Sequence, residues 1–190
     1  MGSTPAEATH AYPTDTSLAQ PSEDWERTAQ SWMREPGGGK VHFVGVGNPI
    51  RQDDAIGLEI VSSLRKKLGP NPSPNVVIHQ PSLMPERLLS KVAATGDRVV
   101  IFDAVEANRT PGAVVCASLA DTKFGFFATH NVPLRLIPGV AGNLGRSFVV
   151  GVQPESLEVG EGLSATARAA KGRIVEAMGA MIGGMGNGHL

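Results

Sequence analysis

The chain has 190 residues, of which 41% are apolar and 18% charged, with 17 lysines and arginines against 18 aspartates and glutamates. This length fits one domain with a substantial core, and the balanced charge excludes a disordered chain and a strongly basic protein that binds nucleic acid. The single cysteine, Cys116, excludes an internal disulfide and any site built from several cysteines. No apolar stretch approaches the roughly 20 residues of a membrane span, so we expect a cytoplasmic protein without membrane insertion.

The folded domain is expected to begin at Lys40. Residues 1–39 contain one residue from the set Val, Ile, Leu and Phe, whereas residues 40–68 contain eleven. Because a core needs such side chains, we expect residues 1–39 to be a flexible, largely disordered extension with a glycine-rich end. Residues 25–34 could form one or two helical turns that rest on the domain, and a functional docking arm is the alternative. A frayed, glycine-rich tail is expected at residues 183–190.

Residues 40–182 alternate the two periodicities that are typical of an α/β domain. Short apolar runs predict buried strands, and apolar residues three and four positions apart predict helices. In chain order the expected elements are a strand at 41–46, a helix at 56–68, a strand at 75–79, a helix at 85–94, strands at 98–102 and 113–117, a helix at 130–137, a strand at 148–152 and a helix at 164–181. The pattern predicts a single doubly wound, mostly parallel, twisted sheet of about five strands with helices on both faces.

In such a sheet the loops that follow the strands meet in a crevice, where binding groups collect. The first strand leads into Gly45-Val46-Gly47-Asn48, and the acidic pair Asp53-Asp54 precedes the next helix. A dinucleotide-binding fingerprint would need a third glycine where Ile50 stands, which disfavours a nucleotide site. Asp53 is the expected N-cap of the helix, so Asp54 is left to point into the crevice.

Asp103 and His130 are the other candidates for chemistry. Asp103 directly follows an apolar strand, where a carboxylate needs a charged partner, loop amides or a metal ion, and turn capping is the alternative role. His130 opens an expected helix, a place where an isolated histidine commonly packs or caps. Two carboxylates and an imidazole that converge would offer oxygen and nitrogen ligands, which suit divalent nickel, zinc, manganese or iron. A site without cysteine argues against structural zinc.

Taken together, these segments resemble the nickel–iron hydrogenase maturation endopeptidases. The segment from Gly45 to Gly57 is similar to the amino-terminal motif of that family, and Phe102-Asp103-Ala104-Val105 is similar to its central aspartate motif. Thr129-His130 corresponds to the histidine of the family, and residues 151–164 resemble its carboxy-terminal signature. The resemblance spans residues 41–181 in the same order and spacing. One departure is Gln80, which stands where the family often has an aspartate after the second strand.

The resemblance implies an aspartic-type endopeptidase that removes a carboxy-terminal extension from a nickel-loaded hydrogenase large-subunit precursor. The metal-contacting and catalytic trio of the family falls on Asp54, Asp103 and His130. Nickel would then arrive with the substrate and serve as a recognition element, rather than being a tightly held cofactor. The expected partner is the large-subunit precursor, and a monomer is favoured.

The residues themselves limit the mechanism. The chain has no G-x-S-x-G motif, and Cys116 lies within an apolar strand, so a covalent acyl-enzyme is not expected. A water molecule activated by a carboxylate, with a metal ion as Lewis acid or as a template, fits the available groups better. The sequence leaves open which carboxylate acts as base. Two alternatives remain: a non-catalytic chaperone that binds the nickel site on the same fold, and a doubly wound enzyme that handles phosphoryl groups or nucleosides.

Overall fold

The computed structural model describes residues 24–34, 39–82, 84–120, 127–128 and 140–186. Its sheet has the strand order β2–β1–β3–β6–β4, with one antiparallel strand at the β4 edge and a short strand, β5, paired to the end of β3. The strands are β1 (Val41–Gly45), β2 (Val76–Ile78), β3 (Arg98–Glu106), β4 (Val114–Ser118), β5 (Phe127–Ala128) and β6 (Ser147–Val152). This confirms the predicted mostly parallel α/β sheet.

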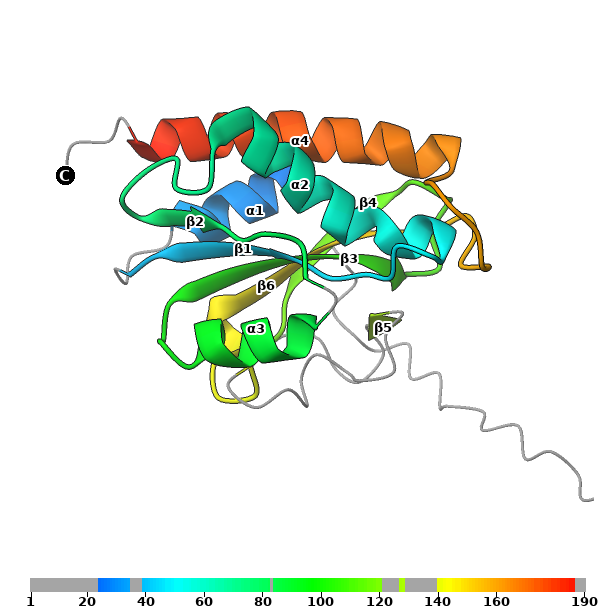
Figure 1. Ribbon diagram of the computed structural model, residues 1–190. Helices are drawn as coiled ribbons and strands as arrows, with labels where there is room; N and C mark the ends of the chain where they lie inside the picture. Colours follow the sequence, from blue (N-terminus) through cyan, green and yellow to red (C-terminus); the bar gives the residue numbers. More distant parts are fainter. Residues whose placement is uncertain (1–23, 35–38, 83, 121–126, 129–139, 187–190) are drawn as a thin grey trace, which may run out of the picture.

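Helices cover both faces of the sheet (Figure 1). Three lie on one face, namely α1 (Trp25–Arg34), α2 (Ile56–Leu68) and α4 (Ala165–Gly186), and α3 (Pro85–Ala93) lies on the other. A short 3-10 helix, η1 (Gln52–Ala55), precedes α2, and another, η3 (Leu144–Arg146), precedes β6. No helix in the described ranges is both long and apolar enough to cross a membrane. The helix expected at 130–137 lies outside the described residues.

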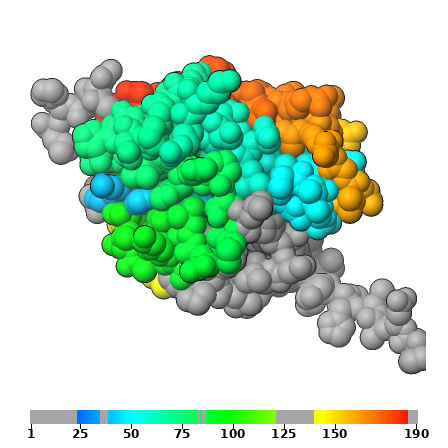
Figure 2. All heavy atoms as spheres, in the orientation of Figure 1, coloured from blue at the N-terminus to red at the C-terminus, as the bar shows by residue number. Residues whose placement is uncertain are grey.

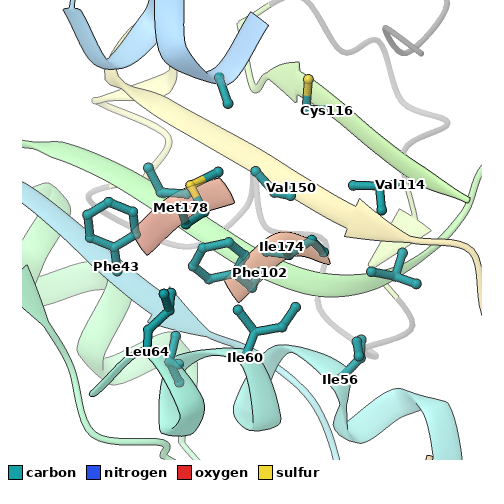
Figure 3. Packing of buried hydrophobic residues seen from close by; sticks show 14 of the residues in the cluster. Phe43, Ile56, Ile60, Leu64, Phe102, Val114, Cys116, Val150, Ile174 and Met178 are labelled. Carbon is teal, nitrogen blue, oxygen red and sulfur yellow. The ribbon is translucent and has the colours of Figure 1, made fainter. Parts of the chain in front are cut away.

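The core has two parts because successive side chains of a strand point to opposite faces. Phe43 and Phe102 stack with their ring centroids 6.1 Å apart, on the face that α2 and α4 cover (Figure 3). Ile101, the neighbour of Phe102, faces the α3 side instead. The central strands are therefore buried on both faces, which explains why they consist of nearly uninterrupted apolar residues.

The expectation that the core starts at Lys40 is wrong for α1. Four residues of this helix are buried against the sheet: Trp25, Ala29, Trp32 and Met33. Their positions in the chain differ by four, three and one, so they lie on one face of the helix. The Trp32 ring stacks on Phe148 of β6 with a centroid distance of 4.9 Å, and Arg98 Nη1 donates hydrogen bonds to the carbonyls of Trp32 and Met33. An apolar face made of tryptophan, methionine and alanine supplies the burial that a count of aliphatic residues missed. The disorder expected for residues 1–23 lies outside the described residues.

Two element ends also differ from expectation. β3 was expected to end at Phe102, but it continues to Glu106 because β6 pairs with it as far as Ala104 and β5 pairs with Val105 and Glu106. Asp103 therefore lies inside the strand, opposite Gly151 of β6. α4 continues through residues 183–186, where a frayed tail was expected, and Ile182 at this end is buried in the core.

Candidate active site

Close backbone packing brings the loop after β1 against the end of β3. A Cβ on Gly57 would lie 2.1 Å from the carbonyl oxygen of Phe102 and 2.2 Å from that of Val46, and one on Gly47 would lie 2.0 Å from the carbonyl oxygen of Asp54. Only glycine permits contacts this close. The glycines of the first motif thus let α2 and its preceding loop lie directly on β3, rather than cradling a phosphate. This packing places Asp54 near Asp103.

Asp54 and Asp103 form a buried pair of carboxyl groups. Asp54 is 1% exposed and lies in η1, while Asp103 is fully buried near the carboxyl end of β3. Oδ1 of Asp103 accepts a 2.8 Å hydrogen bond from the backbone N–H of Ala104. Oδ2 of Asp103 is buried and has no hydrogen-bond partner in the described structure. The sequence prediction that these two carboxylates converge at the strand ends is therefore supported by their geometry.

The surroundings of Asp103 favour its protonated form. Burial raises the pKa of the Asp103 carboxyl well above its usual value, and the negative charge of Asp54 raises it further. The hydrogen bond from Ala104 acts in the opposite direction and is the weakest of these three effects. Burial and the neighbouring acid therefore both favour the protonated form of Asp103 in the free protein.

Asp53 does not cap α2, contrary to the sequence prediction. The residue before α2 is Ala55, and no side chain makes a capping hydrogen bond there. The buried Asp53 carboxylate instead accepts hydrogen bonds from the backbone N–H groups of Glu155 (2.8 Å), Ser156 (3.4 Å) and Ser164 (2.7 Å). Because these donors lie more than 100 positions away in the chain, a local capping rule had no means to find them. Asp53 fastens the loop between β6 and α4 to the segment that carries Asp54.

Replacing Asp53 by alanine should lower the free energy of unfolding by about 3 kcal/mol, because the buried carboxylate is lost and three backbone N–H groups lose their acceptor. Urea denaturation of the variant and the wild type measures this loss. Glu161→Ala, in the same loop but exposed, is the control and should leave stability nearly unchanged. A loss for Asp53→Ala no larger than that of the control would show that the carboxylate does not hold this loop.

His130, the third predicted site residue, lies outside the described residues. Within the part of the chain that the structure describes, no three His, Cys, Asp or Glu side chains are grouped closely enough to hold a metal ion. Asp54 and Asp103 thus provide two acidic groups of the predicted trio. The described segment before His130 ends at Ala128 of β5, which pairs with Val105 of β3.

Gln153 is a buried polar residue of the site that the sequence analysis did not single out. It directly follows β6, and its Oε1 accepts hydrogen bonds from the N–H groups of Ala107 (2.8 Å) and Arg109 (3.3 Å). Its Nε2 donates to Glu106 Oε2 at 3.1 Å. Gln153 therefore fixes the turn that leaves β3. A polar residue at the end of an apolar strand was the available signal, the same one that identified Asp103.

The predicted burial of Cys116 is confirmed. This residue of β4 is 2% exposed, and its Sγ donates to the carbonyl of Trp25 at 3.6 Å. Burial raises the pKa of the Cys116 thiol to about 12. A thiol that stays protonated at neutral pH is a poor nucleophile, which agrees with a mechanism that uses no cysteine.

Comparison with known proteins identifies the family. The model of the family described as HycI, hydrogenase maturation protease, matches residues 58–180, which is more than half of the chain. This chain belongs to the hydrogenase maturation protease family. It is accordingly a peptidase, and the resemblance inferred from the four sequence motifs is confirmed. The match includes Asp103 and the position of His130, and it begins after Asp54.

Solved structures of such proteases share the fold. A [NiFe] hydrogenase maturation protease HycI from Thermococcus kodakarensis KOD1 is 26% identical, with a TM-score of 0.68 over 82% of this chain and 99% of that one. The hydrogenase maturating endopeptidase HybD from E. coli is 25% identical, with a TM-score of 0.56 over 77% and 94%. The endopeptidase HycI from Escherichia coli, 22% identical with a TM-score of 0.61 over 75% and 90%, supports the fold alone. No curated protein matches the sequence.

Proposed function

We propose that this protease removes a carboxy-terminal extension from the large-subunit precursor of a nickel–iron hydrogenase, and that it recognises nickel already bound to that precursor. In this proposal Asp54, Asp103 and His130 contact the nickel and the neighbouring peptide, as an aspartic-type site in the cytoplasm. The observation that supports it is the buried Oδ2 of Asp103, which has no hydrogen-bond partner in the described structure and lies in a pair with Asp54.

A carboxylate oxygen with no partner is costly to bury, so such an atom is typical of a site that is completed by a ligand. Two carboxylates and one imidazole are ligands that suit divalent nickel. A cation would also reverse the electrostatics of the pair, because it favours the ionised form of both acids. Docking of a nickel-loaded precursor is therefore expected to lower the pKa of Asp103, against the effect of its burial.

The same pair can serve peptide hydrolysis. Nickel held by the substrate would supply a positive charge and fix the orientation of the bound chain. A carboxylate of the pair can then accept a proton from the water molecule that attacks the scissile carbonyl. Burial keeps bulk water away from the pair, which strengthens these electrostatic contacts. The site thus needs no nucleophilic side chain, consistent with the protonated thiol of Cys116.

His130 is included because the resemblance places the histidine of the family at this position. The residue itself lies outside the described structure, which follows this segment of the chain as far as Ala128, where β5 pairs with Val105 of β3.

The proposal predicts that cleavage depends on the state of the substrate. Purified precursor, with and without nickel, is mixed with protease that has been treated with a chelator and exchanged into metal-free buffer. The tail is followed by intact-mass spectrometry. Cleavage should be confined to the nickel-loaded precursor, because a nickel-free precursor offers no cation to the buried acids.

Cleavage of the nickel-free precursor would contradict the proposal. A protease with its own metal would cut the nickel-free precursor and would be stopped by the chelator. Equal cleavage of both precursors by chelator-treated protease would reject recognition of nickel and leave Asp54, Asp103 and His130 as hydrolytic residues only. A stable complex with the precursor whose mass never changes would instead indicate the chaperone alternative.

A further inference from the structure

Two aliphatic side chains are exposed in the loops next to η1, the short helix that carries Asp54. Ile50, in the loop between β1 and η1, is 60% exposed, and Val159, in the loop between β6 and α4, is 80% exposed. Across the described residues, only Met84 joins them among the exposed large apolar side chains. Exposing such groups to water is unfavourable, so a pair of them beside a catalytic site is a candidate contact for a partner.

The backbone holds these two side chains as neighbours. Gly160 N–H donates to the carbonyl of Ile50 at 3.0 Å, and Gln52 N–H donates to the carbonyl of Gly160 at 3.0 Å. These bonds form a parallel bridge between Arg51 and Gly160. The residues that precede this bridge, Ile50 and Val159, stand opposite each other in its register. In the space-filling view the cyan segment around Ile50 and the orange segment after β6 are adjacent (Figure 2).

Both loops are fixed in place before any partner binds. Arg51 Nε donates to the carbonyl of Leu157 at 3.1 Å, and the Asp53 carboxylate binds the backbone on both sides of Val159, at Glu155 and Ser164. A contact surface that is already ordered loses little conformational entropy on binding. The exposed pair is therefore built into the fold rather than placed on a loose loop.

Acidic residues surround Val159. Glu158 and Glu161 lie within two positions of it and are exposed, whereas the Glu155 carboxylate accepts a hydrogen bond from Thr166 Oγ1 at 2.8 Å. No basic residue stands between Gln153 and Arg168 in this loop. Arg51, which follows Ile50, donates its Nε–H to the carbonyl of Leu157. The Val159 side of the exposed aliphatic pair is thus bordered by the negative charges of Glu158 and Glu161, which favours a partner surface that is aliphatic at its centre and basic at this edge.

We propose that Ile50, Glu158, Val159 and Glu161 form the docking surface for the protein substrate, and that it contacts an aliphatic segment bordered by basic residues on the large-subunit precursor. The inference rests on the proposed function, because the precursor is the partner that this protease must bring to the Asp54–Asp103 pair. The surface is continuous with that site: Asp54 N–H donates to the carbonyl of Arg51, the residue after Ile50.

The test measures binding and cleavage separately. Affinity for the nickel-loaded precursor is measured by biolayer interferometry, and kcat and KM are measured from release of the tail, for wild type, Ile50→Ser, Val159→Ser and the double variant. Each single change should weaken binding about ten-fold, with a matching rise in KM and an unchanged kcat, because it removes contact area without changing either acid of the pair. Val159→Ile and Ile50→Leu should bind like wild type. Lys66→Ser, an exposed change on α2, is the matched control.

The outcomes separate this inference from the function on which it rests. Wild type that binds the precursor without cutting it would overturn the proposed peptidase substrate, while the serine variants would still report on the docking surface. Serine variants that bind and cut like Lys66→Ser would overturn the docking surface and leave the function intact. A wild-type dimer that dissociates in the double variant, seen by sedimentation velocity, would assign the surface to a second copy of this chain and overturn the inference.

Discussion

Asp103→Asn should lower the cleavage rate about a thousand-fold while the protein stays folded, because an amide keeps the shape of the buried acid but can neither ionise nor transfer a proton. The amide oxygen can accept the hydrogen bond that Asp103 Oδ1 accepts from Ala104. The amide nitrogen then occupies the position of Oδ2, the oxygen that has no partner in the described structure. Intact-mass measurement of the precursor gives the rate, and Glu176→Gln, a change at an exposed ion pair with Lys67, is the control.

The same variant tests the protonation of the pair through the pH dependence of stability. In the unfolded chain Asp103 loses its proton near its ordinary value of 3.8, whereas the folded protein keeps the proton to a higher pH because burial and Asp54 raise its pKa. The stability that this group contributes is therefore complete below pH 3.8 and is lost as the pH rises toward the raised pKa. The loss is about 1.4 kcal/mol per pH unit within that range.

The amide of the Asp103→Asn variant has no proton to lose, so the variant should gain stability relative to wild type as the pH rises from 3.8 toward the raised pKa of Asp103. Urea denaturation at several pH values measures the difference. A difference that stays constant over this range would show that Asp103 titrates alike in the folded and unfolded chains, and the pair would not hold the proton assigned to it.

The acidic pair could be predicted from the sequence because the position of each aspartate relative to a neighbouring strand can be read from the local sequence pattern. Asp54 lies in the segment that follows β1 and Asp103 lies near the carboxyl end of β3, and parallel strands bring their carboxyl ends to one edge of the sheet. The role of Asp53 could not be predicted in this way, because its three donors come from residues 155–164. An aspartate that stands where it could cap the next helix can instead accept hydrogen bonds from a distant loop that folds against it, as Asp53 does.

Element ends were missed for related reasons. β3 extends beyond Phe102 because β5 and β6 supply hydrogen-bond partners, which come from later segments of the chain. The alternative that residues 25–34 form a helix resting on the domain is confirmed by α1. The count that placed the start of the core at Lys40 left this helix out because its apolar face, with Trp25 and Trp32, consists of residues outside the aliphatic set. Local composition indicates whether a segment can form a core only when all of its apolar side chains are counted.

The second large effect that we expect is on stability: Trp32→Ala should lower the free energy of unfolding by about 3–5 kcal/mol. The ring is 5% exposed, stacks on Phe148, and lies under the Arg98 guanidinium at 5.8 Å. Removing it leaves a cavity between α1 and the sheet, and the α1 end that Arg98 fastens loses its main packing contact. A chain that lacks residues 1–34 should lose at least as much stability, because all four buried side chains of α1 go with them.

The matched variants for this prediction lie on the same helix. Trp32→Phe should retain most of the stability, because it keeps a ring against Phe148 and removes a buried indole N–H that has no hydrogen-bond partner in the described structure. Ser31→Ala changes an exposed position of α1 and should have little effect. Urea denaturation followed by circular dichroism gives the free energies. If Trp32→Ala unfolds at the same urea concentration as Ser31→Ala, α1 contributes nothing to the core, and the domain begins at Lys40 as its aliphatic composition first indicated.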